Sequence, residues 1–448
     1  MILLWDEHYV RITLSLLGTY FLIISVMQVL LQALSYRRHQ RRLRVNNEEL
    51  PSLTLLVPAR NEEHVVVEAL SRSLQLPLKK FDVIVVENAS TDKTYELLHE
   101  MFQLRLENGV YRSITHPHLR MVRSKIPGKA LALNVALPHV TTEIVATMDA
   151  DTIPEIHGIE ALLREFKARP EVQGLGGIVR VMNPEKPDER RAYPPRKHEY
   201  AIQSLEYLRA FSGERLGWGL LKANIYMSGA CALFRTSTLR ERGGFQIDTV
   251  TEDLETSLDL ISCADKDQHP IDILPAVVAW TQVPHTLSGL FQQRRRWQAG
   301  LLQCLWKFRG LFLSTKRGVT GILAVPYILF TEGLGPVMEF VAYIMIAVAL
   351  YCEFLEPMPV LIVAGLGLTL SGLLTVWAAS VENRYIKNDS AWPLIKVFFL
   401  SLPLNLIHRP LVNLVRVEAC LRFPWIRSWG VIQRSQLTTT TETSRQQA

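Results

Sequence analysis

The pattern of apolar residues changes twice along the chain and divides it into three parts. Residues 12–34 form a mostly apolar run of 23 residues without a charge, and further apolar runs follow after about residue 319. A helix of that length spans the ~30 Å hydrocarbon core of a membrane. The preceding WDEHYVR is not the basic segment of a signal peptide, and the run is too long for one. We therefore predict a transmembrane helix within residues 1–35.

Between the apolar parts, the pattern is typical of an α/β domain. Short apolar runs occur at residues 53–57, 83–86, 144–148 and 273–279. Stretches with helical spacing, such as EHVVVEALSRSL and TEDLETSLDLI, alternate with them. This alternation predicts a mostly parallel sheet with helices on both faces. Ligands of such sheets bind beyond the carboxyl ends of the strands, so polar residues at those ends are candidates for a site.

The part after the domain is expected to return to the membrane. Residues 286–318 contain FQQRRRWQAGLLQCLWKFRG, a mixture typical of a helix in the membrane interface. Apolar segments follow at 325–351, with a GLGP interruption, at 360–379 and at 394–408. The third is short for a span, and three spans would place the basic tail outside. We therefore interpret the third segment as interfacial or re-entrant.

Charge and cysteine usage argue against two classes of site. The net charge is +6, and RRHQRRLR at residues 37–44 adjoins the first apolar run. That position is typical of the cytoplasmic flank of a span rather than of a nucleic-acid site. The five cysteines form no CxxC pair and no Cys/His cluster with zinc spacing. We expect reduced cysteines, membrane lipids as partners, and no nucleic acid.

The stretch MDADT places two carboxylates at the end of a predicted buried strand. Asp149 and Asp151 stand two residues apart there. Two carboxylates on one short turn repel each other unless a cation lies between them. Oxygen ligands suit Mg²⁺ or Mn²⁺, and Mg²⁺ is commonly held by one or two carboxylates plus substrate phosphates. The alternative is a solvated turn.

Other strand ends and helix starts carry polar clusters with two interpretations each. TEDLETS begins a helix in which Glu252 or Asp253 serves as a general base, or in which Thr251 and the acids only cap the helix. For QRRRW, one interpretation is that the arginines bind a diphosphate and the face of Trp297 packs on a sugar. The other is that the stretch anchors lipid headgroups. IPGKALALN places Lys129 at a helix start, where a lysine and backbone N–H groups favour an anion. The alternative is that Lys129 is an ordinary surface lysine. VPARNEE, taken alone, is better explained by helix capping than by a site.

One more strand end, in VIVVENASTDKT, carries an acid and an amide. Glu87 and Asn88 stand where the chain leaves a run of valines and isoleucine. A buried strand of a parallel sheet does not need polar residues there for its stability. The pair therefore suggests contact with a ligand.

In their order along residues 53–297, these clusters resemble those of membrane-bound family-2 glycosyltransferases, the type of cellulose, hyaluronan and poly-N-acetylglucosamine synthases. The resemblance implies an inverting enzyme with a GT-A-like nucleotide-sugar domain and a Mg²⁺ or Mn²⁺ cofactor. By matching position, the residues along the nucleotide sugar would be Ala59, Arg60, Glu62, Glu87, Asn88, Lys129, Asp149 and Arg296. The metal would be held by Asp149 and Asp151. Asp253, beside Glu252, would be the base, and the acceptor side would hold Gly229, Ala230, Gln293 and Trp297.

The resemblance also bears on the donor and on the tail. In the family an acid commonly ends the second strand, and Glu87 takes its place one residue before Asn88. The amide oxygen of Asn88 can accept a hydrogen bond from uracil N3–H, so we expect a UDP-linked sugar. WGVIQR, from Trp429 to Arg434, has the spacing of the gating loop of cellulose synthases, with Ile432 in place of threonine, or is a basic interfacial tail.

We expect an integral, multi-pass protein of the plasma (inner) membrane with a cytoplasmic catalytic domain, which extends and exports a glycan. Its expected parts are a transmembrane helix (1–35), a basic linker (36–50), the glycosyltransferase domain (51–285), interfacial helices (286–318), membrane helices (319–410) and a basic tail (411–448). Export partners are not identified. Ceramide glucosyltransferases carry similar motifs, so single transfer to a lipid acceptor is an alternative. A transporter or receptor with an inactive domain is another, in which Glu332 and Glu339 would line a passage.

Overall fold

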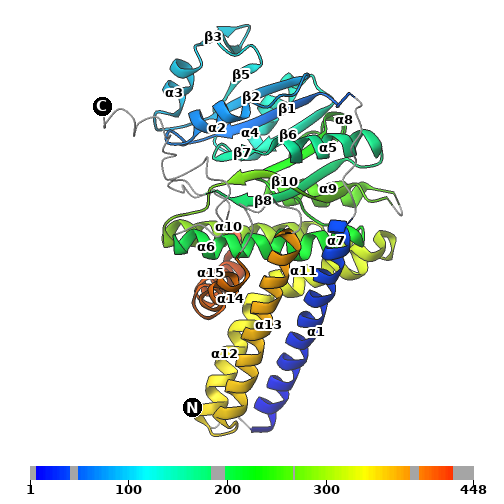
Figure 1. Cartoon of the computed structure of the whole chain (residues 1–448), viewed down its shortest axis with the longest axis vertical. Helices are drawn as coiled ribbons and strands as arrows, with labels where there is room; N and C mark the ends of the chain where they lie inside the picture. Colours follow the sequence, from blue (N-terminus) through cyan, green and yellow to red (C-terminus); the bar gives the residue numbers. More distant parts are fainter. Residues whose placement is uncertain (1–6, 41–48, 183–196, 266–267, 384–392, 427–448) are drawn as a thin grey trace.

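A computed structural model describes residues 7–40, 49–182, 197–265, 268–383 and 393–426. An α/β domain stands on a narrow group of long helices, with a layer of helices between the two (Figure 1). The N-terminal helix α1 (Glu7–Gln40) begins at the far tip of the long helices and ends beneath the domain. Segments 300 residues apart in sequence therefore meet below the sheet.

The domain contains a mixed sheet of ten strands, in the order β3-β4-β5-β2-β1-β6-β9-β8-β10-β7. The strands are β1 Leu53–Ala59, β2 Phe81–Asn88, β3 Leu104–Glu107, β4 Val110–Ser113, β5 Leu119–Ser124, β6 Ile144–Met148, β7 Thr152–Pro154, β8 Gly174–Val181, β9 Cys231–Arg235 and β10 Ile271–Thr281. Strands β5, β2, β1 and β6 are parallel, as are β8 and β10. The prediction of a mostly parallel sheet is wrong in one respect, because β9 runs antiparallel to both neighbours and the edges are antiparallel too.

Alternate residues of the central strands enter two hydrophobic cores, one on each face of the sheet. On β1, Leu55 and Val57 belong to one core, whereas Leu56 belongs to the other, and all three are fully buried. The helices that cover the two faces are α2 Val66–Ser73, α3 Thr94–Met101, α4 Lys129–Ala136, α5 Ile156–Ala168, α8 Thr236–Glu241 and α9 Glu252–Cys263. The period of two in the sequence thus sets which side chains are buried, and leaves the strand ends free for polar residues.

A layer of helices lies across the underside of the sheet (Figure 1). It contains α6 (His198–Leu208), the π-helical turn η3 (Arg209–Arg215), α7 (Leu216–Leu220) and α10 (Leu287–Lys307). The sequence prediction of a long helix carrying QRRRW corresponds to α10. The connection to the membrane helices runs through η4 (Arg309–Leu311), η5 (Thr315–Arg317), the π-turn η6 (Thr320–Ala324), α11 (Val325–Ile328) and the π-turn η7 (Leu329–Gly333).

Three helices within the described residues are long and apolar enough to cross a membrane, or four with one bent pair. The three are Glu7–His39, Pro357–Asn383 and Leu394–Trp425, and the bent pair is Thr320–Gly333 with Gly335–Tyr351. The pair is bent by 49° at Leu334, inside the GLGP stretch where the sequence predicts a break.

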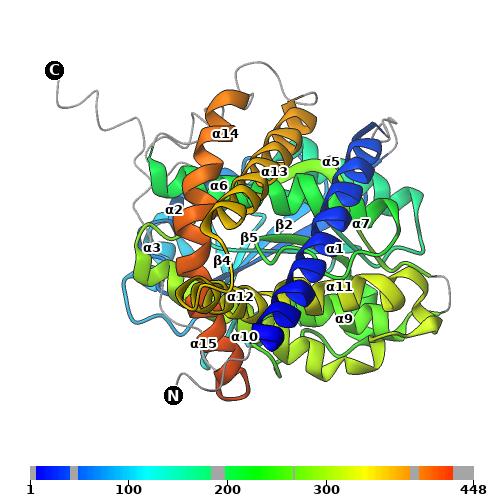
Figure 2. The ribbon, with the colours of Figure 1, turned by 90° about the horizontal axis from the view of Figure 1, so that it is seen from below.

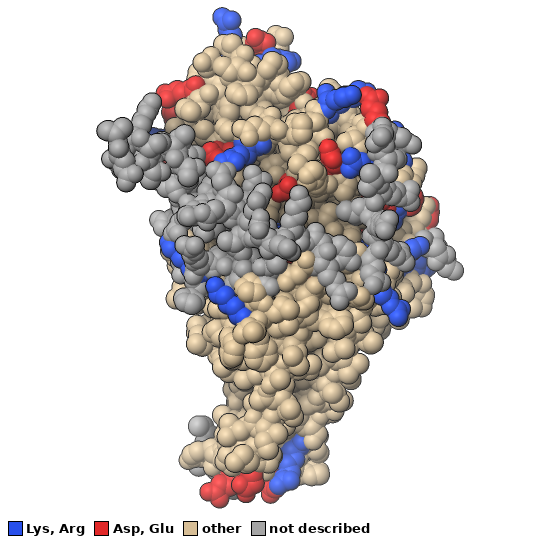
Figure 3. Space-filling view, in the orientation of Figure 1, with Lys and Arg blue, Asp and Glu red and all other residues tan. Residues whose placement is uncertain are grey.

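The helices of this group do not all point the same way. Helices α1, α12 (Gly335–Tyr351) and α13 (Pro357–Asn383) lie in the narrow group below the domain, whereas α14 (Leu394–Pro403) and α15 (Arg409–Arg422) lie against the domain (Figure 1). From below, α14 and α15 form one line across the underside, joined by the π-turn η9 (Leu404–His408) (Figure 2). On the face drawn in Figure 3, the long helices show a band without charged side chains, and charges return at their tip.

Candidate active site

One cavity of about 580 Å³ extends from the carboxyl ends of β1, β2 and β6 down to α1 and α12. Most residues predicted for the site line it. They are Arg60, Glu62, Asn88, Lys129, Asp149, Asp151, Gly229, Ala230, Glu252, Asp253, Gln293, Arg296 and Trp297. Ala59 and Glu87 do not belong to its lining. Residues from seven separate stretches of the sequence thus surround one space, as expected for a site at the carboxyl edge of a sheet.

Lys129 lies at the centre of the charged groups of this cavity. Its Nζ is 2.7 Å from Asp149 Oδ1 and 2.8 Å from Glu252 Oε1, and it donates a hydrogen bond to the Gly229 carbonyl oxygen. Burial lowers the pKa of Lys129, but the carboxylates of Asp149, Glu252 and Asp253 outweigh burial and raise the pKa above its ordinary value. Lys129 is therefore a cation at neutral pH. The interpretation of Lys129 as an ordinary surface lysine is wrong, because only 7% of the residue is exposed.

Glu252 and Asp253 are neighbours at the start of α9 but lie in different surroundings. Burial raises the pKa of Glu252, although the Lys129 ammonium acts in the opposite direction. Asp253 accepts hydrogen bonds from the backbone N–H of Gly229 at 2.8 Å and of Leu254 at 2.9 Å. The two bonds fix the plane of the Asp253 carboxylate at the cavity wall. A Cβ at Gly229 would lie 2.9 Å from Asp253 Oδ2, so only glycine permits this approach.

The helix-capping interpretation of TEDLETS is wrong for Thr251. Thr251 occupies the N-cap position of α9 without a capping hydrogen bond from its side chain. Its hydroxyl group lies 3.6 Å from Cys304 Sγ on α10 instead. The start of α9 is therefore held by contacts with α10 rather than by its own cap.

The carboxylates of the DxD turn differ in exposure and in partners. Asp151 is buried, with Thr152 Oγ1 and Thr281 Oγ1 at 3.3 and 3.4 Å, whereas the Asp149 side chain is 34% exposed toward the cavity. The described residues contain no cluster of three or more His, Cys, Asp or Glu side chains arranged for a metal. The two carboxylates of this turn suit Mg²⁺ or Mn²⁺ held jointly with substrate phosphates.

Glu87 and Asn88, the last two residues of β2, lie in different surroundings. Glu87 is 1% exposed; its carboxylate pairs with Arg123 at 2.9 Å and accepts from the Ser90 N–H at 2.7 Å. Asn88 lines the cavity, and its Oδ1 accepts from the Gly128 N–H at 3.2 Å. Direct contact between Glu87 and a nucleotide is not favoured by this geometry, because the carboxylate is engaged inside the sheet edge.

The VPARNEE cluster connects two loops rather than capping a helix. Helix α2 begins only at Val66, and its N-cap position has no side-chain hydrogen bond. Glu63 accepts from the backbone N–H of Lys93, and Asn61 Oδ1 accepts from that of Thr91. The loops after β1 and β2 thus hold each other at the cavity mouth, beside Arg60 and Glu62.

Helix α10 brings the QRRRW stretch under the cavity. Gln293, Arg296 and Trp297 line it from below. Arg294, which the sequence analysis did not single out, stacks on the Trp297 ring at 4.5 Å and pairs with Glu206 of α6 at 2.5 Å. The stacked arginine fixes the ring plane of Trp297.

The lower part of the cavity contains acids and arginines that lack a sequence motif. Glu332 accepts from the Tyr226 hydroxyl group at 3.1 Å, and Glu339 pairs with Arg409 of α15 at 3.0 Å. Arg209, Glu214, Arg215, Tyr327 and Arg416 also line this part. Arg209, Glu214 and Arg215 lie on the π-helical turn η3, and Glu332 lies on η7. A helical period of 3.6 residues does not predict which way side chains on such turns point.

The cavity charge depends on pH through Glu214. Burial, and next the neighbouring Glu332, raise the pKa of Glu214 to about 7. Between pH 4.5 and 7 the folded state therefore holds a proton that the unfolded state has released, and stability falls as pH rises through this window. Glu214→Gln removes this dependence, which is worth at most about 3 kcal/mol.

We expect the unfolding temperature of the wild-type protein to fall relative to that of Glu214→Gln as the pH rises from 4.5 to 7. Above pH 7 the difference between the two unfolding temperatures should stay constant. Thermal unfolding in detergent at several pH values measures it. Glu241→Gln, at an exposed acid of α8, is the control. A constant difference between Glu214→Gln and wild type across the window would contradict the assignment.

Trp429 and Arg434, the predicted gating loop, lie outside the described residues.

Comparison with known proteins agrees with this geometry. Residues 51–300 match the family described as "Glycosyltransferase like family 2". The poly-beta-1,6-N-acetyl-D-glucosamine synthase of Staphylococcus aureus (strain COL) is 28% identical over 273 residues, covering 61% of this chain and 60% of that protein. The synthase of Staphylococcus epidermidis is 26% identical over 264 residues, 58% of each protein. The chain thus matches about 60% of the length of these relatives.

Among solved structures, a mannosyltransferase from Pyrobaculum calidifontis, in complex with GDP-Man and Mn²⁺, shares the fold. The TM-score is 0.61 at 19% identity, over 93% of this chain and the whole of that one. This likeness confirms the predicted GT-A-like domain combined with apolar helices.

Proposed function

The chain belongs to the glycosyltransferase-like family 2, and on that premise we propose that it extends a β-linked glycan from a nucleotide sugar, with inversion, and exports it. The observation that carries the proposal is the continuity of the cavity. It joins Asp149, Asp253 and Trp297 to residues of α1 and α12 in the membrane region. An acceptor can therefore lie with one end at the catalytic carboxylates and the remainder among the membrane helices.

In the proposed reaction, Asp253 takes the proton of the acceptor hydroxyl group. The acceptor oxygen forms a bond to C1 of the donor sugar as the bond from C1 to the diphosphate breaks on the opposite side. One base is sufficient, because a nucleoside diphosphate leaves without protonation. The contacts with Gly229 and Leu254 hold Asp253 in place for this transfer. Arg296 is proposed to bind the diphosphate, and Gln293 and Trp297 the acceptor sugar.

We propose that Asp149 and Asp151 hold Mg²⁺ or Mn²⁺. The support is the donor set, two oxygen ligands at the cavity and a lysine that balances the remaining charge. When bound, the ion would stabilise the negative charge on the leaving diphosphate. A mannosyltransferase of the same fold was solved with Mn²⁺. Lys129 and Arg296 would contribute further positive charge from the protein itself.

The proposed donor is a UDP-linked sugar. Asn88 lines the cavity with an amide oxygen that retains a lone pair after it accepts from Gly128, as contact with a uracil N3–H requires. The relatives named above are poly-N-acetylglucosamine synthases, whereas the mannosyltransferase was solved with GDP-Man. Donors of both classes therefore belong in the test.

We propose three spans, α1, α12 with its bent start, and α13, and a domain on the cytoplasmic side of the plasma membrane. The support is the direction of α14 and α15, which lie across these helices against the domain (Figure 2). Arg37 and Arg38, at the domain end of α1, fit the cytoplasmic side. We also propose the division at residues 51–285, 286–318, 319–410 and 411–448, although its last boundary falls inside α15.

The experiment is incubation of the purified protein with UDP-N-acetylglucosamine, UDP-glucose and GDP-mannose, each with Mg²⁺ or Mn²⁺, followed by sizing and linkage analysis. We expect a polymer from one UDP-sugar. A lipid that carries a single sugar would contradict polymer synthesis and support the lipid-acceptor alternative. Absence of both transfer and nucleotide-sugar hydrolysis with every donor would contradict an active enzyme.

A further inference from the structure

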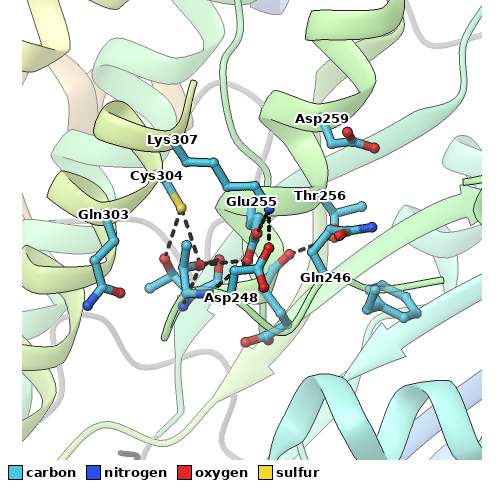
Figure 4. A network of polar contacts seen from close by, with 12 residues as sticks. Gln246, Asp248, Glu255, Thr256, Asp259, Gln303, Cys304 and Lys307 are labelled. Atoms are coloured by element: carbon cyan, nitrogen blue, oxygen red, sulfur yellow. Dashed lines mark hydrogen bonds and ion pairs between the residues drawn. The ribbon is translucent and has the colours of Figure 1, made fainter. Parts of the chain in front are cut away.

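One face of α10 touches the cavity in its first half and the start of α9 in its second half. Gln293, Arg296 and Trp297 line the cavity. The same face continues at a spacing of three and four residues through Gly300, Gln303, Cys304 and Lys307. Figure 4 shows Gln303, Cys304 and Lys307 beside Asp248 and Glu255. We call Gly300, Gln303, Cys304 and Lys307 the α10 clamp.

The clamp neutralises a carboxylate that the catalytic cavity does not contain. Glu255, two residues after Asp253, is fully buried and outside the cavity lining. Lys307 Nζ lies 2.5 Å from Glu255 Oε1 and 2.6 Å from Asp248 Oδ2. Thr249 donates to Glu255 Oε2 with its hydroxyl group at 2.8 Å. A buried carboxylate is costly without such partners, so the loop before α9 depends on Lys307.

Gly300 and Cys304 of the clamp contact Thr251, the residue before α9. A Cβ at Gly300 would lie 2.4 Å from Thr251 Oγ1 and Cγ2, closer than real Cβ contacts. Cys304 Sγ donates to Thr249 Oγ1 at 3.4 Å and lies 3.6 Å from Thr251 Oγ1. The helix and the loop are therefore in direct contact two residues from Asp253.

Gln303 connects three segments with one side chain. Its Oε1 accepts from the Val250 N–H at 3.2 Å. Its Nε2 donates to the carbonyl oxygens of Phe423 and Ile426 at 2.8 and 2.7 Å. The amide thus fixes the loop before α9 to α10 and to the segment that follows α15.

We propose that the α10 clamp is a positioning element, which sets Asp253 at a fixed distance from Arg296 and Trp297. The inference rests on the proposed function of Asp253 as the base. Both halves of the reaction site are attached to one helix, so a shift of the loop on α10 changes the distance between base and acceptor. A displacement of 1 Å can lower turnover by about 10²-fold.

The test is Lys307→Met in the full-length protein, assayed for transfer with the active donor. We expect kcat to fall about tenfold to a hundredfold, with the KM for the nucleotide sugar within about twofold, because the cavity residues that bind it are unchanged. Arg309→Met is the matched control, a cation near the end of the same helix whose side chain is exposed and donates to Trp306. It should leave kcat unchanged.

A double variant separates positioning from general damage. If Lys307 acts through Asp253, then Lys307→Met causes no further loss in the Asp253→Asn background. Equal fold losses in both backgrounds would overturn the proposal, as would wild-type kcat of Lys307→Met. A fully active Asp253→Asn protein would instead overturn the base assignment, which is a different result.

Lys307→Met leaves a buried acid without its cation and can fail to fold. Glu255→Gln combined with Lys307→Met removes both charges and retains an amide that can accept from Thr249. This pair is expected to fold and to show the same fall in kcat. Gly300→Ala tests the contact with Thr251 independently, with Gly310→Ala as control because a Cβ at Gly310 meets nothing within 4 Å. Normal kcat of the folded neutral pair and of Gly300→Ala together would overturn the proposal.

Discussion

Asp253→Asn is expected to lower transfer by about 10²–10⁴-fold while nucleotide binding is largely retained. Asparagine is nearly isosteric but retains only one of the two hydrogen bonds, because Asp253 accepts from Gly229 through Oδ2 and from Leu254 through Oδ1, and an amide has a single oxygen. It cannot take a proton from the acceptor. The loss should therefore appear in kcat, with little change in the affinity for the nucleotide.

The measurement is steady-state transfer together with calorimetric titration of the nucleotide product in the absence of acceptor. Asp259→Asn is the matched control, since Asp259 lies on the same helix and pairs with Arg242 at 2.7 Å outside the cavity. It should retain turnover. Full turnover of Asp253→Asn would remove Asp253 from the role of base and leave Glu252 as the remaining acid of the motif.

The sequence predicted the main strands and the position of the site because both follow from periodicity. The apolar run 144–148 corresponds to β6, and runs 53–57 and 83–86 fall inside β1 and β2. Carboxyl ends of parallel strands meet at one edge, so motifs far apart in sequence had to meet there. Lys129 and Asp149, twenty residues apart, are in contact for this reason.

Other features depend on tertiary contacts that periodicity does not encode. Glu87 and Asn88 look equivalent in sequence, yet Arg123 from β5 engages Glu87 and leaves only Asn88 at the cavity. The chain passes through α6, η3 and α7 between β8 and β9, and β9 then pairs antiparallel with both β6 and β8. The lower lining, with Glu214 and Arg209, stands on a π-turn that a period of 3.6 misplaces.

For residues 394–425, the length of the helix favours a membrane span, whereas the direction of the helix does not. Residues 394–425 pass the length and composition criteria for a span, although the sequence segment looked short. The helix nevertheless lies against the domain, where Arg416 donates to Gln298 Oε1 and the Glu332 carbonyl oxygen. Arg409 and Arg416 of α15 thus line the lower part of the cavity. These contacts support the proposal that this segment is interfacial, whereas its apolar length alone would favour a span.

Lys129→Met is expected to abolish most transfer, to lower stability, and to make stability respond to divalent cations. Lys129 balances Asp149 and Glu252, and removal of one partner of a buried ion pair costs about 3–5 kcal/mol. The uncompensated carboxylates of the variant attract Mg²⁺ or Mn²⁺ more strongly. A cation that binds only the folded state then raises its unfolding temperature.

Thermal unfolding of both proteins with EDTA, Mg²⁺ or Mn²⁺ measures this response without any activity assay. The shift between EDTA and the divalent ion should be larger for Lys129→Met than for wild type, and absent when Asp149 is also replaced by asparagine. Lys316→Met, at an exposed lysine, should behave as wild type. An equal shift in all proteins would mean that the ion binds elsewhere, and that Asp149 does not hold it.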